Sequence, residues 1–298
     1  MSDRVPPFAA LRVLETASRL RSYSQTGEAL GVTHSAVSQT VRRLEQTYGL
    51  RLFRRQGMHM EPTLAALALA KAYREAAHIV QRATDDLRSR EGEATLVLST
   101  VPSIAKWLGP RLNRMREALP DITVDVRTSR HLANLETDGV DVALRIGQGA
   151  WPGLTSELLI EEFVFPVCSP EFLERHPDLN ERTLASAPLI REDIDLWPAW
   201  CAAAGLAPPS PIRGPEFDDS ALTVEAAVAG LGVALVRRLH AHDALAAGKL
   251  VKVSASRMKD PYGCYLVWRD DNPRIEAIRR FCDWVLAECD RAGLLEAA

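Results

Sequence analysis

The spacing of apolar residues over the first fifty positions predicts three helices. Apolar side chains recur at helical steps over residues 8–20. Ser22 and Gln25 have the spacing of a capping box, and Gly31 stands where a helix can end in a left-handed residue. Thr33 then caps the third helix, whose inward side is expected to hold Ala36, Val37, Val41 and Leu44. A helix, a tight turn and a second helix form the shape that enters the DNA major groove, although enzymes also contain ordinary helical hairpins.

A short hairpin and one long helix are predicted next. Gln56 and Gly57 form a turn signal between two short extended pieces, and Pro62 ends the second piece, which is typical of a β-wing. Residues 64–90 contain neither Gly nor Pro. A narrow stripe on this helix holds Leu64, Leu67, Lys71, Ala72, Ala76, Ile79, Ala83 and Leu87. The stripe favours a linker helix that also dimerises, and the alternative is a helix packed on its own domain.

Beyond residue 92 the pattern changes to short apolar strands that alternate with helices. Strands are predicted at residues 95–101, 122–128 and 140–147, with helices at 102–118 and 132–138 between them. This alternation favours a mostly parallel sheet covered by helices.

The remaining residues predict a second α/β unit and a closing helix. Its elements are expected at residues 163–168, 197–205, 222–236, 264–269 and 272–292. The fold class is therefore α/β behind a winged helix-turn-helix head. We expect three parts, namely a head, a linker helix and a larger α/β domain at residues 1–63, 64–91 and 92–298.

The composition of the chain is that of a globular protein without a membrane-spanning segment. Hydrophobic residues make up 47% and charged residues 25%, as in ordinary globular chains, and no apolar run reaches transmembrane length. The N-terminus has no apolar signal region, and the five cysteines show no CxxC spacing, as expected for reduced thiols. We therefore expect a cytoplasmic protein without membrane contact.

Charge is unevenly placed along the chain. Residues 1–62 hold nine Arg, no Lys and five acidic residues, a formal charge of +4, whereas the whole chain carries −3. A basic head on an acidic body indicates a polyanionic partner for the head alone.

Motifs of catalysis and metal binding are missing from the sequence. There is no GxSxG, no P-loop and no GxGxxG before a helix, and no nucleophile stands in a recognisable set with a base. His240-x-His242 has no Cys or acidic residue at metal-ligand spacing. We expect no enzymatic activity, no metal and no cofactor.

Longer motifs resemble the LysR-type transcriptional regulators over nearly the whole chain. The head contains THSAVSQTVRRLE followed by LFRR. The C-terminal half is similar to the glycine-cleavage-activator-like branch in PSIAKWLGPRL, DGVDVALRIGQGAWPGL and FDDSALTVEAAVAGLGVALV. Departures from the family pattern are Thr26-Gly27 in place of two alanines, His34 in place of a base-contacting glutamine, and Ala66 in place of a glycine. A Gly within a helix is expected to cost about 1 kcal/mol relative to Ala.

This resemblance implies a ligand-responsive, sequence-specific regulator that binds double-stranded promoter DNA as a dimer or tetramer, with RNA polymerase as a further partner. It implies two periplasmic-binding-protein-like lobes, formed by residues 92–162 with 267–298 and by residues 163–266. Crossover strands are expected near residues 163–168 and 264–268. A small-molecule effector is expected in the cleft between the lobes.

Candidate DNA-binding residues lie on the outward side of the third helix and in the wing. The first turn of that helix points at base edges, Gln39 can pair with an adenine, and the arginines can contact phosphates. The alternative for each is ordinary surface solvation. The set is Thr33, His34, Ser35, Ser38, Gln39, Arg42, Arg43, Arg54 and Arg55.

Candidate effector-binding residues begin where the first strand of the large domain meets its helix. Backbone N–H groups and hydroxyls there can hold a carboxylate, and Arg145 can pair with an anion. The alternatives are that Ser99 and Ser103 only cap the helix, and that Arg145 only pairs with Asp141 or a neighbour. The set is Ser99, Thr100, Pro102, Ser103, Arg145, Phe217, Asp219 and Gly232, with Asp218 and Val233 as neighbours.

One alternative function stays open at this point. It is a two-lobed small-molecule-binding protein or enzyme whose head mediates protein contacts. The basic head and its helical hairpin favour the DNA-binding regulator.

Overall fold

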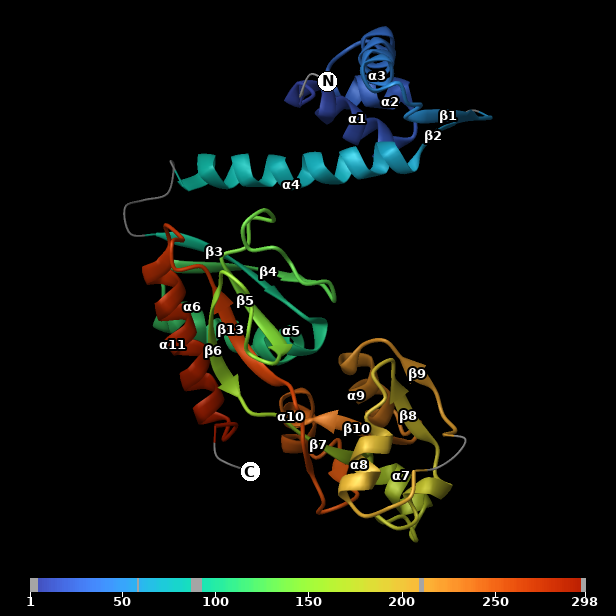
Figure 1. Ribbon diagram of the computed structural model, residues 1–298, viewed down its shortest axis with the longest axis vertical. Helices are drawn as coiled ribbons and strands as arrows, with labels where there is room; N and C mark the ends of the chain where they lie inside the picture. Colours follow the sequence, from blue (N-terminus) through green and yellow to red (C-terminus); the bar gives the residue numbers. More distant parts are fainter. Residues whose placement is uncertain (1–4, 58, 87–92, 209–211, 296–298) are drawn as a thin grey trace. The chain divides into compact units, whose positions relative to one another are not determined.

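Residues 5–57, 59–86, 93–208 and 212–295 are described by the computed structural model. The chain divides into two units, Met1–Ser89 and Arg90–Ala298. Figure 1 labels their elements. The first unit consists of α1 (Phe8–Leu20), α2 (Tyr23–Leu30), α3 (His34–Tyr48), the hairpin strands β1 (Phe53–Gln56) and β2 (His59–Pro62), and α4 (Leu64–Asp86).

The caps of α2 and α3 form as predicted. Ser22 Oγ accepts the Gln25 backbone N–H at 3.4 Å, and Thr33 Oγ1 accepts the Ala36 N–H at 3.2 Å. Gly31 is left-handed, with φ of 66°, so α2 can turn directly into α3. Only half of the predicted capping box is present, because the hydrogen bonds of the described residues include none from the Gln25 side chain to Ser22.

One apolar core joins the helices of the first unit to the hairpin. Val37, Val41 and Leu44 of α3 are buried as expected, whereas Ala36 is only half-buried. The shared core consists of Leu14, Ala17, Val41, Leu44, Leu52, Phe53, Ala66 and Ala70. This packing fixes α3 against α1 and leaves its polar side outward.

Helix α4 packs on the rest of the first unit with one side only. Ala66 and Ala70 are buried in the shared core. Leu64 and Ile79, on the predicted stripe, are 86% and 42% exposed. The chain's own core therefore leaves much of this stripe uncovered. The expected helix end at residue 90 lies outside the described residues.

The first sheet of the second unit is mixed. Its order is β4-β3-β5-β13-β6. The strands are β3 (Ala94–Thr100), β4 (Ile122–Thr128), β5 (Val142–Gly147), β6 (Thr155–Ile160) and β13 (Gly263–Trp268). Strand β3 is parallel to β4 and β5, but β13 is antiparallel to β5 and β6. The three strands predicted at residues 95–101, 122–128 and 140–147 are parallel to one another as expected, and the sheet is mixed because the returning chain enters as β13 between β5 and β6 in the opposite direction.

Three helices cover one face of this sheet (Figure 1), namely α5 (Pro102–Leu108), α6 (Leu112–Ala118) and α11 (Ile275–Arg291). The single helix expected over residues 102–118 is wrong. A 3-10 turn at Gly109–Arg111 separates α5 from α6. Pro110 lies in this turn and has no N–H to give to a continuous helix.

The helix expected over residues 132–138 is a loop. Asp138 Oδ2 accepts the Asn134 N–H at 2.8 Å, and Asn134 Oδ1 accepts the Glu136 N–H at 2.8 Å. These bonds give the backbone a turn in place of helical hydrogen bonds. Gly139, with φ of 63°, then leads the chain toward β5.

A second sheet forms the other lobe of this unit, in the order β11-β7-β10-β8-β9, with β12 also paired to β7. The strands are β7 (Phe163–Cys168), β8 (Leu189–Glu192), β9 (Glu216–Phe217), β10 (Val233–Arg237), β11 (Val251–Lys252) and β12 (Met258–Lys259). One apolar cluster packs with α7 (Pro170–Arg175) and α8 (Trp197–Ala203), and another with α9 (Ser220–Val228) and α10 (Arg238–Ala246). The sequence had not revealed β8, α7 or α10.

The chain crosses between the lobes at two adjacent places. One crossing lies between β6 and β7, at residues 161–162, and the other between β12 and β13, at residues 260–262. The Asp260 N–H donates to the Glu162 carbonyl oxygen at 2.9 Å, which ties the crossings together. The first sheet resumes at Gly263, earlier than the expected residue 267.

No helix in the described part of the chain has both the length and the apolar character needed to cross a membrane.

Candidate DNA interface and effector cleft

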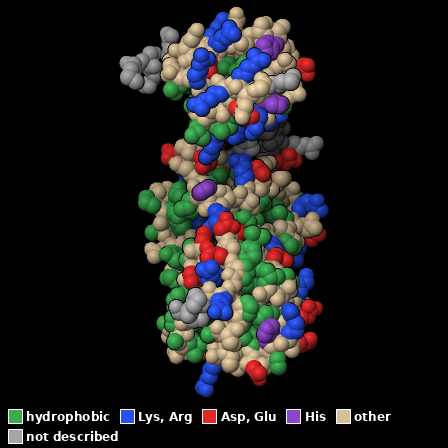
Figure 2. Space-filling view, turned by 90° about the vertical axis from the view of Figure 1, so that its right-hand side faces the viewer, with side chains coloured by type: hydrophobic (Ala, Val, Ile, Leu, Met, Phe, Trp, Pro, Cys, Tyr) green, Lys and Arg blue, Asp and Glu red, His purple; other side chains and the backbone are tan. Residues whose placement is uncertain are grey.

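The predicted DNA-binding residues gather on one side of α3 and on the hairpin. All nine are exposed apart from Ser38, which is half-buried. Figure 2 shows Lys and Arg side chains, in blue, on the facing surface of the first unit. A hollow of about 420 Å³ between α3 and the hairpin brings together His34, Ser38, Arg42 and Arg55.

The candidate arginines differ from most of the other described arginines of this unit in their partners. Within the described chain, no carboxylate lies within 4.0 Å of the guanidinium groups of Arg42, Arg43, Arg54 and Arg55. Ion pairs are formed instead by Arg19, Arg21, Arg51 and Arg74. The four candidate arginines thus lie unpaired on the surface that α3 and the hairpin present, and Arg12 of α1 is a further exposed arginine without an ion pair in the described chain.

Glu45 holds the hairpin in place beside α3. Its Oε1 accepts the Leu52 N–H at 2.8 Å and the Phe53 N–H at 3.4 Å. The ring of Tyr23 packs edge-on against Phe53 with centroids 5.5 Å apart, and burial raises the pKa of its hydroxyl. Sequence reasoning missed both residues, because a glutamate within an exposed helix carries no local sign of such a role.

Gly27 lies where the α2–α3 turn passes closest to α2. A Cβ at this position would meet the Val32 carbonyl oxygen at 2.6 Å. The expected gain of helix propensity from Ala is therefore opposed by a backbone contact. Among the other departures, His34 is exposed beside the hollow, and Ala66 is fully buried in the core.

Two cavities mark the space around the strand ends of the second unit. The cleft cavity, about 260 Å³, lies between the lobes and is lined by Val101, Ser103, Arg130 and Ile146 of the first lobe and by Glu192, Asp193, Asp219 and Arg237 of the second. The strand-end cavity, about 220 Å³, is lined by Ser99, Thr100, Val101, Arg130, Arg145 and Ile146. Because three residues line both, the two cavities are adjacent.

Arg145 is a buried cation without a carboxylate partner. Its side chain is 6% exposed, donates to the Ala133 carbonyl oxygen, and lies near the Trp151 ring. Burial lowers its pKa. A pair with Asp141 does not form, because no carboxylate of the described residues lies within 4.0 Å of Arg145 and Asp141 binds Arg274, Asn272 and the Val97 N–H instead. The other alternative, a bond to a neighbour, is present in the contact with the Ala133 carbonyl oxygen.

The hydroxyls at the end of β3 do not cap the helix. The N-cap of α5 is Val101, which makes no side-chain cap bond. Thr100 is 3% exposed, and its Oγ1 has no hydrogen-bond partner in the described part of the chain. Helix α5 has only seven residues, so its own dipole is a weak source of anion affinity. Ser99 and Ser103 line the cavities, whereas Pro102 does not appear in either lining.

The second lobe contributes acidic residues to the cleft cavity. Glu192 accepts from the Ser220 hydroxyl at 2.9 Å, and burial raises its pKa. Asp219 caps α9 by accepting the Ala221 N–H at 2.8 Å. Phe217 packs with the apolar cluster of the second lobe instead of lining these cavities. Gly232 lies at the far end of β10, where a Cβ would meet the Pro188 carbonyl oxygen at 2.3 Å.

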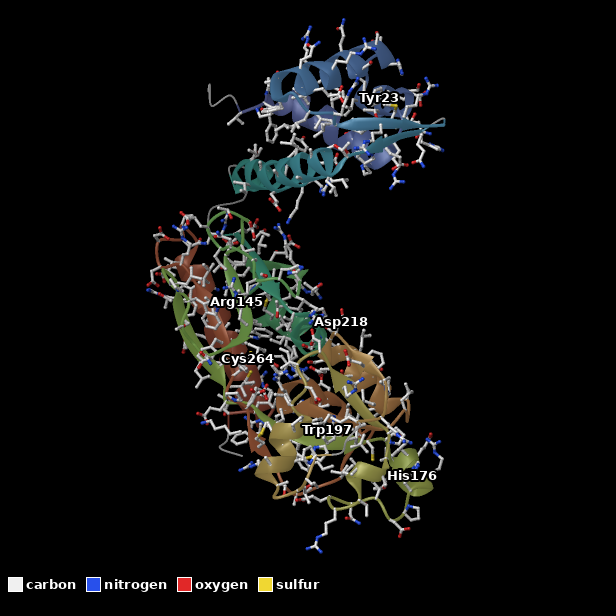
Figure 3. All side chains as sticks on the ribbon, turned by 45° about the vertical axis from the view of Figure 1, so that its right-hand side comes forward. Tyr23, Arg145, His176, Trp197, Asp218 and Cys264 are labelled. Atoms are coloured by element: carbon white, nitrogen blue, oxygen red, sulfur yellow. The ribbon has the colours of Figure 1, made fainter. Side chains whose placement is uncertain are left out.

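Arg130 joins the two lobes across the cleft. Its guanidinium pairs with Asp193 and, at 3.0 Å, with Asp218. Figure 3 shows Asp218 at the part of the second lobe that faces the first, and Arg145 within the first lobe. Sequence reasoning missed Arg130 and Glu192. The rule that ligands bind beyond the carboxyl ends of parallel strands pointed to Ser99. Applied after β4, which ends at Thr128, the same rule also points to Arg130.

Two further buried groups lie close to the cleft and the crossings. His240 lines the cleft cavity, both its ring nitrogens lack partners among the described residues, and burial lowers its pKa to about 3. Glu162, at the first crossing, is 1% exposed, and burial raises its pKa to about 7 despite the positive charges of Arg237 and Arg238. His240 is therefore neutral near pH 7, and Glu162 titrates there.

A helix-turn-helix that presents unpaired arginines, together with a two-lobed domain around a polar cleft, defines a DNA-binding regulator with a sensor for small molecules. Family models agree with this assignment. The model for bacterial regulatory helix-turn-helix proteins of the LysR family matches residues 8–67, and the LysR substrate binding domain matches residues 89–290. The chain belongs to the LysR family of transcriptional regulators, and the comparisons favour this function over the alternative of a protein-binding head.

Individual relatives support the family over the full chain. The glycine cleavage system transcriptional activator of Escherichia coli strain K12 is 34% identical over 295 residues, which cover 97% of this chain and 95% of the relative. The AmpR effector binding domain from Citrobacter freundii has a TM-score of 0.59 and 25% identity, over 67% of this chain and all of that domain. The full-length Vibrio cholerae activator AphB has a TM-score of 0.58 at 20% identity, over 95% of this chain and 99% of its own, and supports the fold.

Proposed function

We propose that α3 enters the major groove of double-stranded promoter DNA while the hairpin contacts the adjoining phosphates. The observation that supports this is the set of unpaired arginines on one exposed side of the first unit, namely Arg42, Arg43, Arg54 and Arg55. Cations without internal partners are free to replace the counterions of DNA phosphates.

Base reading is assigned to the polar side chains of α3. His34, Ser38 and Gln39 point away from the core and have the donors and acceptors that base edges require. Thr33 and Ser35 are proposed to position the helix as well, because their hydroxyls lie 2.9 Å apart and Thr33 also caps α3.

Assembly is assigned to the exposed side of α4. Leu64, Leu67, Ile79 and Val80 are all more than 40% exposed, which favours a second copy of the helix on this side. We propose a dimer or tetramer, with residues 1–63 as the DNA-binding head, 64–91 as the linker and 92–298 as the effector-binding domain. RNA polymerase is proposed as a further partner, since the E. coli relative is named an activator.

The effector is proposed to bind between the lobes with a carboxylate near Arg145 and Thr100. A buried guanidinium without a carboxylate and a buried hydroxyl without a partner both gain from an anion in the strand-end cavity. We infer that the protein acts by binding, without catalysis, in the cytoplasm where promoter DNA is found.

The DNA-binding proposal is tested by fluorescence anisotropy with the DNA upstream of the protein's own gene. The double variant Ser38→Ala with Arg42→Ala should bind about a hundredfold more weakly or worse, because charge-assisted contacts are lost in each head. Its oligomeric state, measured by analytical ultracentrifugation, should be unchanged. Arg116→Ala is the matched control, because Arg116 is exposed on α6 in the other unit. Normal binding by the double variant would show that α3 is not the recognition helix.

A further inference from the structure

The charged side chains around the two cavities fall into paired and unpaired groups. Arg130 is neutralised by Asp193 and Asp218 of the second lobe. Arg237 is neutralised by Asp260, whose carboxylate is fully buried, at 2.7 Å. These two arginines line the cleft cavity, but their charges already have internal partners.

Arg145 is the arginine around these cavities that remains without an ionic partner. It lies at one end of the combined space that the cleft cavity and the strand-end cavity form. Within the described residues it has no carboxylate partner, and Thr100 beside it has an unpartnered hydroxyl. Both side chains are more than nine-tenths buried and belong to the strand-end cavity. A buried charge of this kind is stabilised by a ligand of opposite charge.

Glu192 is the complementary anion, and it lies on the other side of the combined space. It accepts a hydrogen bond from Ser220 and, among the described residues, forms no ion pair. Asp219, next to it in the cleft cavity, caps α9 and also has no cationic partner in that part of the chain. The second lobe thus offers two carboxylates that form no ion pair with an arginine or lysine of the described chain, although the charge of Arg237 acts on Glu192 from a distance.

A single ligand can satisfy both ends, because the cavities share Val101, Arg130 and Ile146. With cavities of about 260 and 220 Å³, the combined space lies at the lower end of the roughly 300–1,000 Å³ range of small-molecule pockets, which suits a small metabolite. Ile146 and Val101 between the ends favour an apolar middle.

We propose that the effector is a small zwitterion, such as an amino acid, whose carboxylate binds Arg145 and Thr100 and whose ammonium group binds Glu192 and Asp219. The inference rests on the proposed effector cleft, and it adds that the ligand has a cationic end which the second lobe binds. Because one end contacts the first lobe and the other end the second, the ligand bridges the lobes beside the Arg130 ion pairs.

The test uses the full-length protein, calorimetric titration and thermal shift. The probes are the twenty α-amino acids and a series of ω-amino acids of increasing chain length. Each one that binds is compared with its N-acetyl derivative, which lacks the ammonium charge, and with its amide, which lacks the carboxylate. We expect at least one amino acid to bind and both of its derivatives to bind about tenfold more weakly or worse.

Variants assign the two ends. Glu192→Gln should weaken binding of the amino acid about tenfold and leave binding of the N-acetyl derivative unchanged. Arg145→Gln should weaken binding of the amino acid and of its N-acetyl derivative and leave binding of the amide unchanged. Thr100→Val is the milder partner of Arg145→Gln, since it removes a hydroxyl and keeps the shape. Glu171→Gln, on an exposed face of α7, is the matched control. An unchanged thermal unfolding curve in the absence of ligand confirms that each variant is folded.

The outcomes separate this inference from the proposed cleft. If carboxylic acids without an amine bind as tightly as amino acids, or if Glu192→Gln binds the amino acid normally, the zwitterion is wrong and the cleft stands. If no carboxylate of either kind binds and Arg145→Gln changes nothing, the proposed effector site itself is wrong.

Discussion

Arginines lie in both proposed binding regions of this protein, but under opposite conditions. In the first unit Arg42 and Arg54 are exposed and stand on elements close together in the sequence. In the second unit Arg145 is 6% exposed, and the groups that complete its site come from β3 and from a lobe that the chain reaches later. Water solvates the first set of charges, whereas only a ligand completes the second.

The difference teaches what each region can recognise. Exposed cations attract any polyanion, and salt screens their effect within about 10 Å. A buried cation in a small cavity instead selects ligands of one shape and of negative charge, because any other ligand leaves the guanidinium desolvated and unpaired. On the proposed function, we therefore expect the head to supply affinity through charge and the cleft to supply selectivity through burial.

The largest expected effect concerns salt and the head. If four arginines in each of two heads contact phosphates, log K should fall with log salt at a slope of about −7, and Arg54→Ala with Arg55→Ala should reduce this to about −4. Anisotropy titrations at several salt concentrations measure both slopes. An unchanged slope in the variant would place the hairpin away from the DNA. Effector binding, in contrast, should depend far less on salt.

The next effect tests whether burial of a charged group controls the pH dependence of stability in the second unit. Glu162 has a pKa raised to about 7 from an ordinary value of 4.5. Between these values the unfolded chain loses its proton first, so stability should fall as pH rises, by about 3 kcal/mol above pH 7. Glu162→Gln should remove this loss, as measured by urea unfolding from pH 5 to 8. Parallel curves for both proteins would show that Glu162 is hydrated in solution.

A smaller effect is expected from the cap of α3. Thr33→Ala removes the bond from the Ala36 N–H and should cost about 1 kcal/mol. Hydrogen exchange should show faster opening in α3, with the second unit unchanged. Thr47→Ala is the control, because Thr47 lies late in the same helix and bonds only the Arg43 carbonyl oxygen. Equal effects of the two variants would contradict the capping role.

The smallest effect concerns Gly27. Propensity alone predicts that Gly27→Ala stabilises the head by about 1 kcal/mol, but the new Cβ would meet the Val32 carbonyl oxygen at 2.6 Å. We expect no net gain in thermal unfolding of the head. A clear rise in melting temperature would show that the α2–α3 turn relaxes easily.

Local chemistry explains which parts of the fold were predictable. The caps at Ser22 and Thr33 and the turn at Gly31 depend on residues within three positions, so the head could be derived from its sequence. The loop at 132–138 could not, because Asn134 and Asp138 compete for the backbone in a way that helical spacing does not show. In the same way, Pro110 interrupts a pattern whose apolar spacing continues through it.

The cleft was predictable only on the side that one strand end defines. Thr100 and Arg145 follow from the rule that ligands bind at the carboxyl ends of parallel strands. Glu192 comes from a four-residue strand that the pattern did not reveal, so its position opposite them required the folded chain. Gly232 is a predicted effector-binding residue, but it lies at the end of β10 that is far from the cleft cavity.

The two adjacent crossings limit how the second unit can move. The peptide hydrogen bond from Asp260 to Glu162 ties the two crossings into a hinge between the lobes. We expect such a hinge to allow rotation of one lobe about the other and to resist sliding or twisting. We therefore expect a ligand in the proposed cleft to change mainly the angle between the two lobes.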